Sequence, residues 1–199
     1  LVLTEGIAAI SDYIRNLEQK DSKKYFINDE KISKTFYGIE KDNRLARVSK
    51  IALLLNGANE AHIKAMDGLC HDANFLGERN SFDILVANPP YSVNDFKLHI
   101  DRRLWVEFGL LQYMSSSCKN IENVFVERIN HLLKPNGIAA VILPNSVLNG
   151  LDTDYIKTRE LILKNFKIHC ITHFEGKTFG KTPTRTEILF LEKSSIIPN

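Results

Sequence analysis

The sequence predicts an α/β fold with a mainly parallel sheet, because short apolar runs alternate along it with segments of helical period. The clearest strand is 82–87 (FDILVA), whose unbroken apolar run is typical of a strand buried on both faces. Composition agrees, since 199 residues with 44% hydrophobic and 25% charged residues provide enough apolar material for a globular core. We therefore expect one domain over residues 1–199.

The first half of the chain predicts two helices and two strands. Apolar residues recur at steps of three and four over 3–17, which predicts an amphipathic helix. The segment 34–40 (KTFYGIE) predicts a strand. A helix follows over 45–55, where apolar residues keep a helical period until Asn56-Gly57 ends it. Residues 61–66 predict a weaker second strand.

The middle of the chain combines a long irregular segment with a helix and a strand. Residues 92–120 show only a partial helical pattern, and a connection of this length within a domain is usually functional or disordered. A helix over 125–133 leads through a turn at 134–137 into a strand at 138–143, which Pro144 ends.

The end of the chain predicts a helix and two strands that form a hairpin. The helix covers 153–165, and the strands cover 166–174 and 186–192. Because the connection 175–185 is too short for a helical crossover, we expect the last strand to be antiparallel.

The composition excludes disordered, collagen-like and disulfide-stapled proteins. The apolar runs are far shorter than the roughly 20 residues of a membrane-spanning helix, and no signal-peptide pattern opens the chain. We therefore expect a cytoplasmic protein without a membrane partner. The net charge of +2 permits an acidic partner without requiring one. The three cysteines are Cys70, Cys118 and Cys170, and their spacing is not that of a metal site or a redox motif. We therefore expect no metal site, and we expect the three thiols to be free and buried or half-buried.

A polar side chain follows each of four predicted strands. These residues are Glu40, Asp67, Asn88 and Asn145. Ligands of open parallel sheets bind beyond the carboxyl ends of the strands, so this pattern predicts a site with two carboxylates and two amides. Taken singly, each carboxylate could equally cap a helix or lie in a loop.

The most specific motif is Asn88-Pro89-Pro90-Tyr91, directly after the buried strand. The alternative is a proline-rich turn that only ends the strand. An amide-like nitrogen is a poor nucleophile because its lone pair is delocalised, so a catalyst must accept hydrogen bonds from its N–H groups. The Asn88 side-chain oxygen can accept one, and the Pro89 carbonyl can accept a second. Tyr91 offers a flat face for stacking a planar group.

With this motif the chain resembles the adenine-N6-specific, S-adenosylmethionine-dependent DNA methyltransferases, and most of all the modification subunits of type I restriction systems. The resemblance covers nearly the whole chain. Its segments are 37–42 (YGIEKD), Asp67-Gly68, 82–91 (FDILVANPPY), 125–144 and 174–192. It implies a Rossmann-like methyltransferase fold, a bacterial origin and S-adenosylmethionine as the cofactor.

The resemblance also implies roles for individual residues. In the family, the acid at Glu40 binds the ribose of the cofactor, and the acid of Asp67-Gly68 contacts its adenine ring. Asn88 contributes both to the cofactor site and to catalysis. Tyr91 and Phe179 sandwich an adenine that has left the DNA duplex, while Asn88 and Pro89 hold its N6 amino group. The alternative for Phe179 is a core aromatic.

Between Gly176 and Thr186, within the predicted hairpin connection, the sequence has no acid and three basic residues: Lys177, Lys181 and Arg185. They suit DNA phosphates, although three such charges are more often a solvated loop. The same alternatives apply to the basic residues after the motif, which are Lys97, His99, Arg102 and Arg103.

The glycine-rich turn of the family's cofactor site has no counterpart, since the sequence contains no Gly-x-Gly. We therefore expect a chain that lacks the family's first strand and that, alone, binds S-adenosylmethionine weakly or not at all and does not methylate DNA. The implied partners are double-stranded DNA, a specificity subunit and a restriction subunit. Two alternatives remain: a methyltransferase acting on protein glutamine or RNA bases with the same motif, and a non-catalytic fragment that assembles with partner chains.

Overall fold

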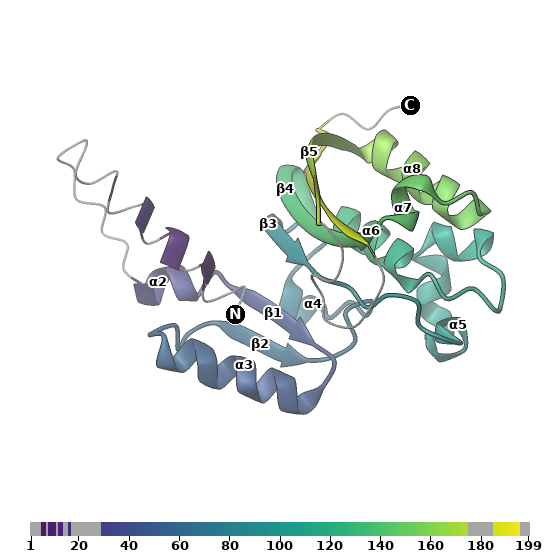
Figure 1. Ribbon diagram of the computed structural model, residues 1–199. Coiled ribbons are helices and arrows are strands. Elements are labelled where there is room, and N and C mark those ends of the chain that lie inside the picture. Colours follow the sequence, from purple (N-terminus) through teal and green to yellow (C-terminus); the bar gives the residue numbers. More distant parts are fainter. Residues whose placement is uncertain are drawn as a thin grey trace. The chain divides into compact units, whose positions relative to one another are not determined.

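Figure 1 shows the fold of the chain in a computed structural model, which describes residues 29–174 and 185–195 together with 5, 6, 8–10, 12, 13 and 16. The chain divides into two compact units, Leu1–His71 and Asp72–Asn199. The expectation of a single domain over 1–199 stays a prediction. Of the predicted opening helix, the residues that the structure describes are helical.

The first unit contains a two-stranded parallel sheet and a helix between its strands. Its elements are α2 (Asp29–Ser33), β1 (Tyr37–Glu40), α3 (Asn43–Leu55) and β2 (His62–Ala65). Asp42 caps α3, because its side chain accepts hydrogen bonds from the backbone N–H groups of Arg44 and Leu45. A small core holds this unit together, and it consists of Ile32, Ala46, Leu53, Ala58 and Ile63.

Helix α3 turns a different side to this core than its apolar period predicts. Ala46 and Leu53 are 3% exposed. Of the five residues that carry the predicted period, Ala52 is half-buried, and the other four are more than half exposed. These residues are Leu45, Val48, Ile51 and Leu55. Two short strands cover only one side of the helix, so the periodicity identifies the helix correctly but not the face that its own unit buries.

The second unit contains a four-stranded sheet in the order β3-β4-β6-β5. Its strands are β3 (Phe82–Ala87), β4 (Leu133–Pro144), β5 (Phe166–His173) and β6 (Thr186–Lys193). β3 is parallel to β4, while β6 is antiparallel to β4 and to β5. The predicted antiparallel last strand is thus confirmed, and it lies between its two neighbours (Figure 1).

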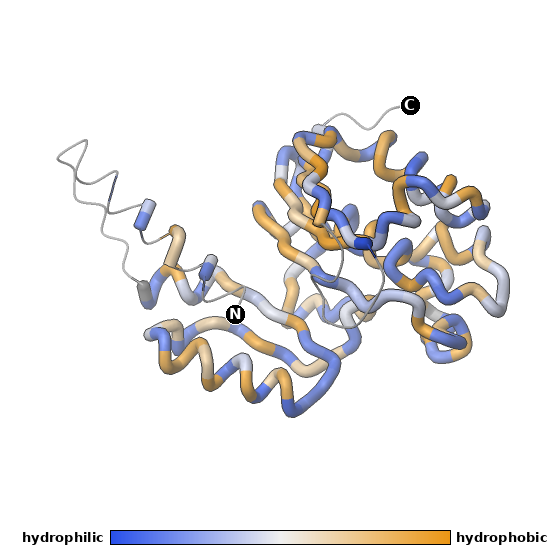
Figure 2. The backbone as a smooth tube through the Cα atoms, in the orientation of Figure 1, coloured by the Kyte–Doolittle hydropathy of each residue, from blue (hydrophilic) through white to orange (hydrophobic). Residues whose placement is uncertain are grey.

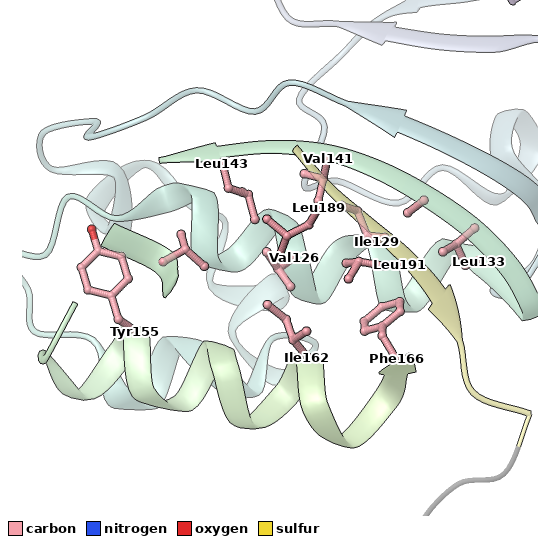
Figure 3. Packing of buried hydrophobic residues seen from close by; sticks show 12 residues of the cluster. Val126, Ile129, Leu133, Val141, Leu143, Tyr155, Ile162, Phe166, Leu189 and Leu191 are labelled. Atoms are coloured by element: carbon pink, nitrogen blue, oxygen red, sulfur yellow. The ribbon is translucent and has the colours of Figure 1, made fainter. Parts of the chain in front are cut away.

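Helices of the second unit cover one face of this sheet. They are α6 (Ile121–Leu132), α8 (Thr153–Asn165) and the short α7 (Ser146–Asn149). The unit also contains α4 (Ala73–Leu76), α5 (Phe96–His99) and the 3₁₀ turns 102–106 and 109–113. Figure 3 shows side chains of α6 and α8 meeting those of β4 and β6. Among them, Val126 and Leu189 are fully buried. Burying such side chains stabilises the fold by about 1.5–3 kcal/mol each.

The prediction that β3 is buried on both faces is wrong for the described chain. Ile84 and Val86 are 65% and 54% exposed, while Leu85 and Ala87 pack against the core. Figure 2 shows hydrophobic residues along most of β3. Side chains alternate between the two faces of a strand, and the helices of this unit cover only one of them.

The turn expected at 134–137 lies inside β4 rather than before it. β4 begins at Leu133, and its register with β3 shifts after the pair Phe82–Leu133. Asn136 adopts a positive φ of 63°, which lets the chain bend within the strand. The predicted change of direction is present, but hydrogen bonding to β3 begins earlier than the apolar run indicates.

Two further expectations can be compared with the structure. Among the described residues, no helix combines the length and hydropathy that a membrane span requires. Cys70 and Cys118 are half-buried as expected, whereas Cys170 is exposed because its side chain lies on the edge strand β5.

Candidate active site

The motif Asn88-Pro89-Pro90-Tyr91 directly follows β3, so it lies at the carboxyl end of this strand. Asn88 and Tyr91 contact each other there. The Tyr91 hydroxyl lies 2.9 Å from Asn88 Oδ1 and 3.1 Å from the backbone oxygen of Ile142 in β4, and it can donate to either. Pro89 is buried, whereas Asn88 is exposed. The structure therefore brings the predicted amide acceptor and the predicted stacking ring together.

The phenol of Tyr91 is in an environment that disfavours its ionisation. Burial raises the pKa of Tyr91 to about 12, and the nearby carboxylate of Glu122 contributes in the same direction. Tyr91 thus keeps its proton at neutral pH and remains a hydrogen-bond donor. The side-chain oxygen of Asn88 has two lone pairs, so it can accept the hydrogen bond from the Tyr91 hydroxyl and a second one from a substrate amine.

Glu122 contacts the chain directly after the motif, and the sequence analysis did not identify it. Its Oε2 accepts a hydrogen bond from the backbone N–H of Ser92 at 3.3 Å, and the side chain is 0% exposed. A signal was present, because Glu122 precedes Val126 and Ile129 by four and seven residues. These positions share one helix face, which places a carboxylate on the apolar side of α6.

In the first unit, the two predicted cofactor acids follow neighbouring strands. Glu40 ends β1 and pairs in register with Ala65 of β2, and the backbone N–H of Met66 donates to the Glu40 carbonyl at 3.1 Å. Asp67 is the next residue along the chain. Because parallel strands end at the same edge, Glu40 and Asp67 lie side by side, as the sequence predicts.

The carboxylates of Glu40 and Asp67 make local contacts that hold their loops. Glu40 Oε1 accepts from the backbone N–H of Asp42 at 2.9 Å, and Asp67 Oδ1 accepts from Leu69 at 3.0 Å. Lys41 forms an ion pair with Asp67 Oδ2 at 2.8 Å. The Asp67 side chain stays 38% exposed. Carboxylate oxygens accept hydrogen bonds, from ribose hydroxyls in the role implied for Glu40 and from the adenine amino group in the role implied for Asp67, so this pair of acceptors fits the implied cofactor.

Asn145, the fourth polar residue at a strand end, forms hydrogen bonds with residues around the start of β6. Its Nδ2 donates to Oε1 of the buried Glu187, and its backbone N–H donates to the carbonyl of Arg185 at 2.9 Å. Glu187 also contacts Nδ1 of His173 at 2.9 Å. Asn145 therefore anchors the hairpin formed by β5 and β6.

The basic residues predicted to contact DNA phosphates differ in their exposure, and some of them lie outside the described residues. Arg185 is exposed beside this anchor, whereas Lys177, Phe179 and Lys181 lie outside the described residues. Lys97 is only 8% exposed, and its ammonium donates to two backbone carbonyls, so it is not placed for phosphate contact. Its burial reflects the packing of the segment 92–120 onto α6 and α8.

The comparison with protein families matches residues 13–196 to the N-6 DNA methylase family. The chain belongs to this family. The match covers nearly the whole sequence, so it includes both units and every residue assigned to the candidate site.

Solved structures similar to this N-6 DNA methylase chain show the same fold. A chain from a study of type I restriction-modification complex assembly has 22% identity and a TM-score of 0.66, covering 86% of this chain and 34% of that one. The type I methyltransferase subunit from Streptococcus thermophilus has 22% identity and a TM-score of 0.59, covering 79% and 33%. A protein from Listeria monocytogenes assigned as a class I S-adenosylmethionine-dependent methyltransferase has 20% identity and a TM-score of 0.60, covering 96% and 51%.

These comparisons confirm the predicted fold class and the resemblance to type I modification subunits. S-adenosylmethionine is the cofactor that this fold and this family imply. The N-6 DNA methylase chain spans about a third of the length of the type I chains that it matches. The roles of individual residues in the site stay predictions.

Proposed function

We propose that the natural protein transfers a methyl group from S-adenosylmethionine to N6 of an adenine flipped out of DNA, as part of a restriction-modification system. The observation that carries this proposal is the contact between Asn88 and Tyr91 at the end of β3 in a chain of the N-6 DNA methylase family. An amide acceptor beside a flat ring suits a planar base that carries an amino group.

Asn88 and Pro89 make the amino nitrogen of the adenine reactive. Asn88 Oδ1 accepts one N–H of the amine, and the carbonyl of Pro89 accepts the other. These two bonds draw the nitrogen lone pair out of conjugation with the ring and direct it towards the methyl group. With the cofactor bound, the nitrogen would form the new bond to the methyl carbon while the carbon–sulfur bond breaks and leaves its electron pair on sulfur, and the nitrogen would then release one proton to water. Catalysis is therefore positioning and polarisation, without a histidine or cysteine base.

Tyr91 has two tasks in this mechanism. Its hydroxyl fixes the rotamer of Asn88, so that the oxygen rather than the amide nitrogen faces the substrate. Its ring stacks on the flipped base, and Phe179 packs on the opposite side.

Glu40, Asp67 and Gly68 hold the cofactor. S-adenosylmethionine supplies an electrophilic methyl group on its sulfonium. Glu40 binds the ribose hydroxyls, and Asp67 with Gly68 contacts the adenine ring. Both acids follow parallel strands whose ends lie at one edge of the sheet, which supports a shared ligand.

DNA and partner subunits complete the proposed function. Lys177, Lys181 and Arg185 flank Phe179 in the sequence between β5 and β6, and Arg185, the described one of the three, is exposed. We assign these charges to the phosphates beside the flipped adenine. The similar type I chain comes from a study of complex assembly, which supports a specificity subunit and a restriction subunit as partners.

The test is methyl transfer by the natural protein, combined with a type I specificity subunit, on duplex DNA from labelled S-adenosylmethionine. We expect label on adenine N6, and Asn88→Ala reduces the rate at least about 100-fold, as for loss of a preorganised polar group. Asn94→Ala is the matched control, because Asn94 is exposed in the same loop.

The same assay separates the alternatives. RNA and a release-factor-type protein are offered in place of DNA, and label on either one identifies a different substrate class. Unchanged adenine methylation in Asn88→Ala refutes the mechanism. Absence of methyl transfer to all three substrates, with stable binding to the specificity subunit, indicates a non-catalytic assembly role.

A further inference from the structure

Glu122 is a buried carboxylate whose position calls for an explanation. It lies in the first turn of α6 and is 0% exposed. Besides the backbone N–H groups of Ser92 and of Glu122 itself, the carboxylate is near Tyr155, whose hydroxyl lies 3.5 Å from Oε1. A buried carboxylate costs free energy unless hydrogen bonds compensate for lost water, so a hydrophobic residue would stabilise the core more simply.

Ser92 has a backbone conformation that needs support. Its φ is 51°, in the left-handed region that a residue with a Cβ rarely adopts. Ser92 directly follows Tyr91, so its conformation sets the direction in which the chain leaves the motif. The carboxylate of Glu122 accepts the N–H of this residue at 3.3 Å.

The motif is therefore held from two sides. On one side, the Tyr91 hydroxyl lies within hydrogen-bond distance of both Asn88 and the backbone of Ile142 in β4. On the other side, Ser92 is bound to α6 through Glu122. Both supports come from regular elements of the second unit, which position a loop more precisely than loop-to-loop contacts do.

We propose that Glu122 is a positioning residue of the methyl-transfer site, which holds the Asn88–Tyr91 loop in its reactive geometry through the backbone N–H of Ser92. This inference rests on the proposed function, since it assigns the loop to catalysis. Glu122 touches neither the base nor the methyl group in this mechanism. It acts through the loop, so its loss lowers the rate of transfer rather than the affinity for the cofactor.

The same helix supplies a matched control. Glu127 is also buried, at 8% exposure, and its carboxylate accepts backbone hydrogen bonds from Gly109 at 2.8 Å and from Leu110 at 3.0 Å. It anchors a loop that is not part of the motif. Glu122 and Glu127 thus share residue type, helix, burial and bonding, and they differ in the loop that they hold.

The experiment compares Glu122→Met, Glu122→Gln and Glu127→Met in the natural protein. Methionine keeps the length of the side chain but cannot replace the carboxylate acceptor, whereas glutamine still offers an oxygen to Ser92. Single-turnover methyl transfer and the Kd for S-adenosylmethionine are measured at a temperature where all variants are folded. We expect Glu122→Met to lower the transfer rate about 10- to 100-fold, the effect of a small misplacement, with cofactor Kd changed less than about twofold. Glu122→Gln restores most of the rate, and Glu127→Met keeps it.

Hydrogen exchange of backbone amides provides a readout that does not depend on activity. In Glu122→Met, we expect the Ser92 amide to exchange at least about tenfold faster than in the wild-type protein. In Glu127→Met, we expect the same increase for the amides of Gly109 and Leu110. An unchanged Ser92 amide in Glu122→Met overturns the proposal, as does an equal loss of transfer rate in Glu122→Met and Glu127→Met. If the wild-type protein methylates no adenine, the proposed function fails, while the exchange data still show whether Glu122 holds the loop.

Discussion

The Tyr91 hydroxyl lies 2.9 Å from Asn88 Oδ1, so the two chemically distinct ends of the motif can support each other. Tyr91→Phe removes this bond and keeps the ring. Because a neutral hydrogen bond contributes about 0.5–1.5 kcal/mol, we expect transfer to slow about 2- to 10-fold. Tyr91→Ala also removes the stacking face and slows it further. Tyr113→Phe, at a partly exposed ring, is the control, and a Tyr91→Phe enzyme as fast as wild type contradicts the positioning role of the hydroxyl.

Glu40→Gln tests the ribose contact. The amide keeps the size of the side chain but loses the charge that strengthens hydrogen bonds to hydroxyls, so we expect the Kd for S-adenosylmethionine to rise about tenfold or more. Glu60→Gln, at an exposed site of the same unit, leaves the Kd unchanged. Calorimetric titration of the natural protein measures both. Equal affinities of the two variants exclude Glu40 as a ribose ligand.

Regular elements with strong local signals were predicted most accurately. The strand 82–87 and the helix 153–165 have the observed bounds, because proline ends the first and a continuous helical period defines the second. The strand expected from Lys34 begins only at Tyr37, since the backbone N–H groups of Thr35 and Phe36 donate to the carbonyls of Ile32 and Ser33 at the end of α2 and form a turn there. In these residues the hydrogen bonds of the turn outweigh the intrinsic preference for a strand.

The site was predictable as far as residue order allows. The motif follows β3, and the two acids end or follow β1 and β2 of the other sheet, so residue order alone places each of them at the carboxyl end of its own strand. Glu122 was not predicted, because its contact with Ser92 joins residues 30 positions apart and depends on how α6 packs on the sheet. The burial of Lys97 was missed for the same reason, since a sequence pattern does not show which backbone carbonyls will surround a lysine.

Glu122 also makes the stability of the protein depend on pH. Burial raises the pKa of Glu122 above its ordinary value of 4.5, and the nearby acid Asp154 adds to the shift, whereas hydrogen bonds from its own backbone N–H, from Ser92 and from Tyr155 oppose it. The folded state therefore keeps the proton at a pH where the unfolded chain has released it. The free energy of unfolding consequently falls as the pH rises from about 4.5 through the raised pKa, by at most about 1.4 kcal/mol per pH unit for one group.

Glu122→Gln removes this contribution, because glutamine does not titrate. We expect the free energy of unfolding of the variant to fall less steeply than that of wild type over this pH window. Urea unfolding at a series of pH values measures the difference. Glu78→Gln, at an exposed position, should follow the wild-type curve. Parallel curves for wild type and Glu122→Gln would show that the Glu122 carboxyl titrates alike in the folded and unfolded states.

Lys97 stabilises the segment between the motif and α6. Its Nζ donates to the carbonyls of Leu111 at 3.0 Å and Met114 at 2.5 Å, and it lies 4.7 Å from the centre of the Trp105 ring. Lys97→Met keeps the apolar stem but removes the donor for two buried carbonyls, so we expect the free energy of unfolding to fall by about 2 kcal/mol or more. Lys164→Met, at an exposed position of α8, changes it by less than about 0.5 kcal/mol. Urea unfolding, followed by the fluorescence of Trp105, measures the free energy of unfolding of both variants. Trp105 is the only tryptophan and lies in this segment, so its fluorescence reports directly on the segment. A Lys97→Met protein as stable as Lys164→Met would mean that water reaches these carbonyls and that the segment does not depend on the buried ammonium.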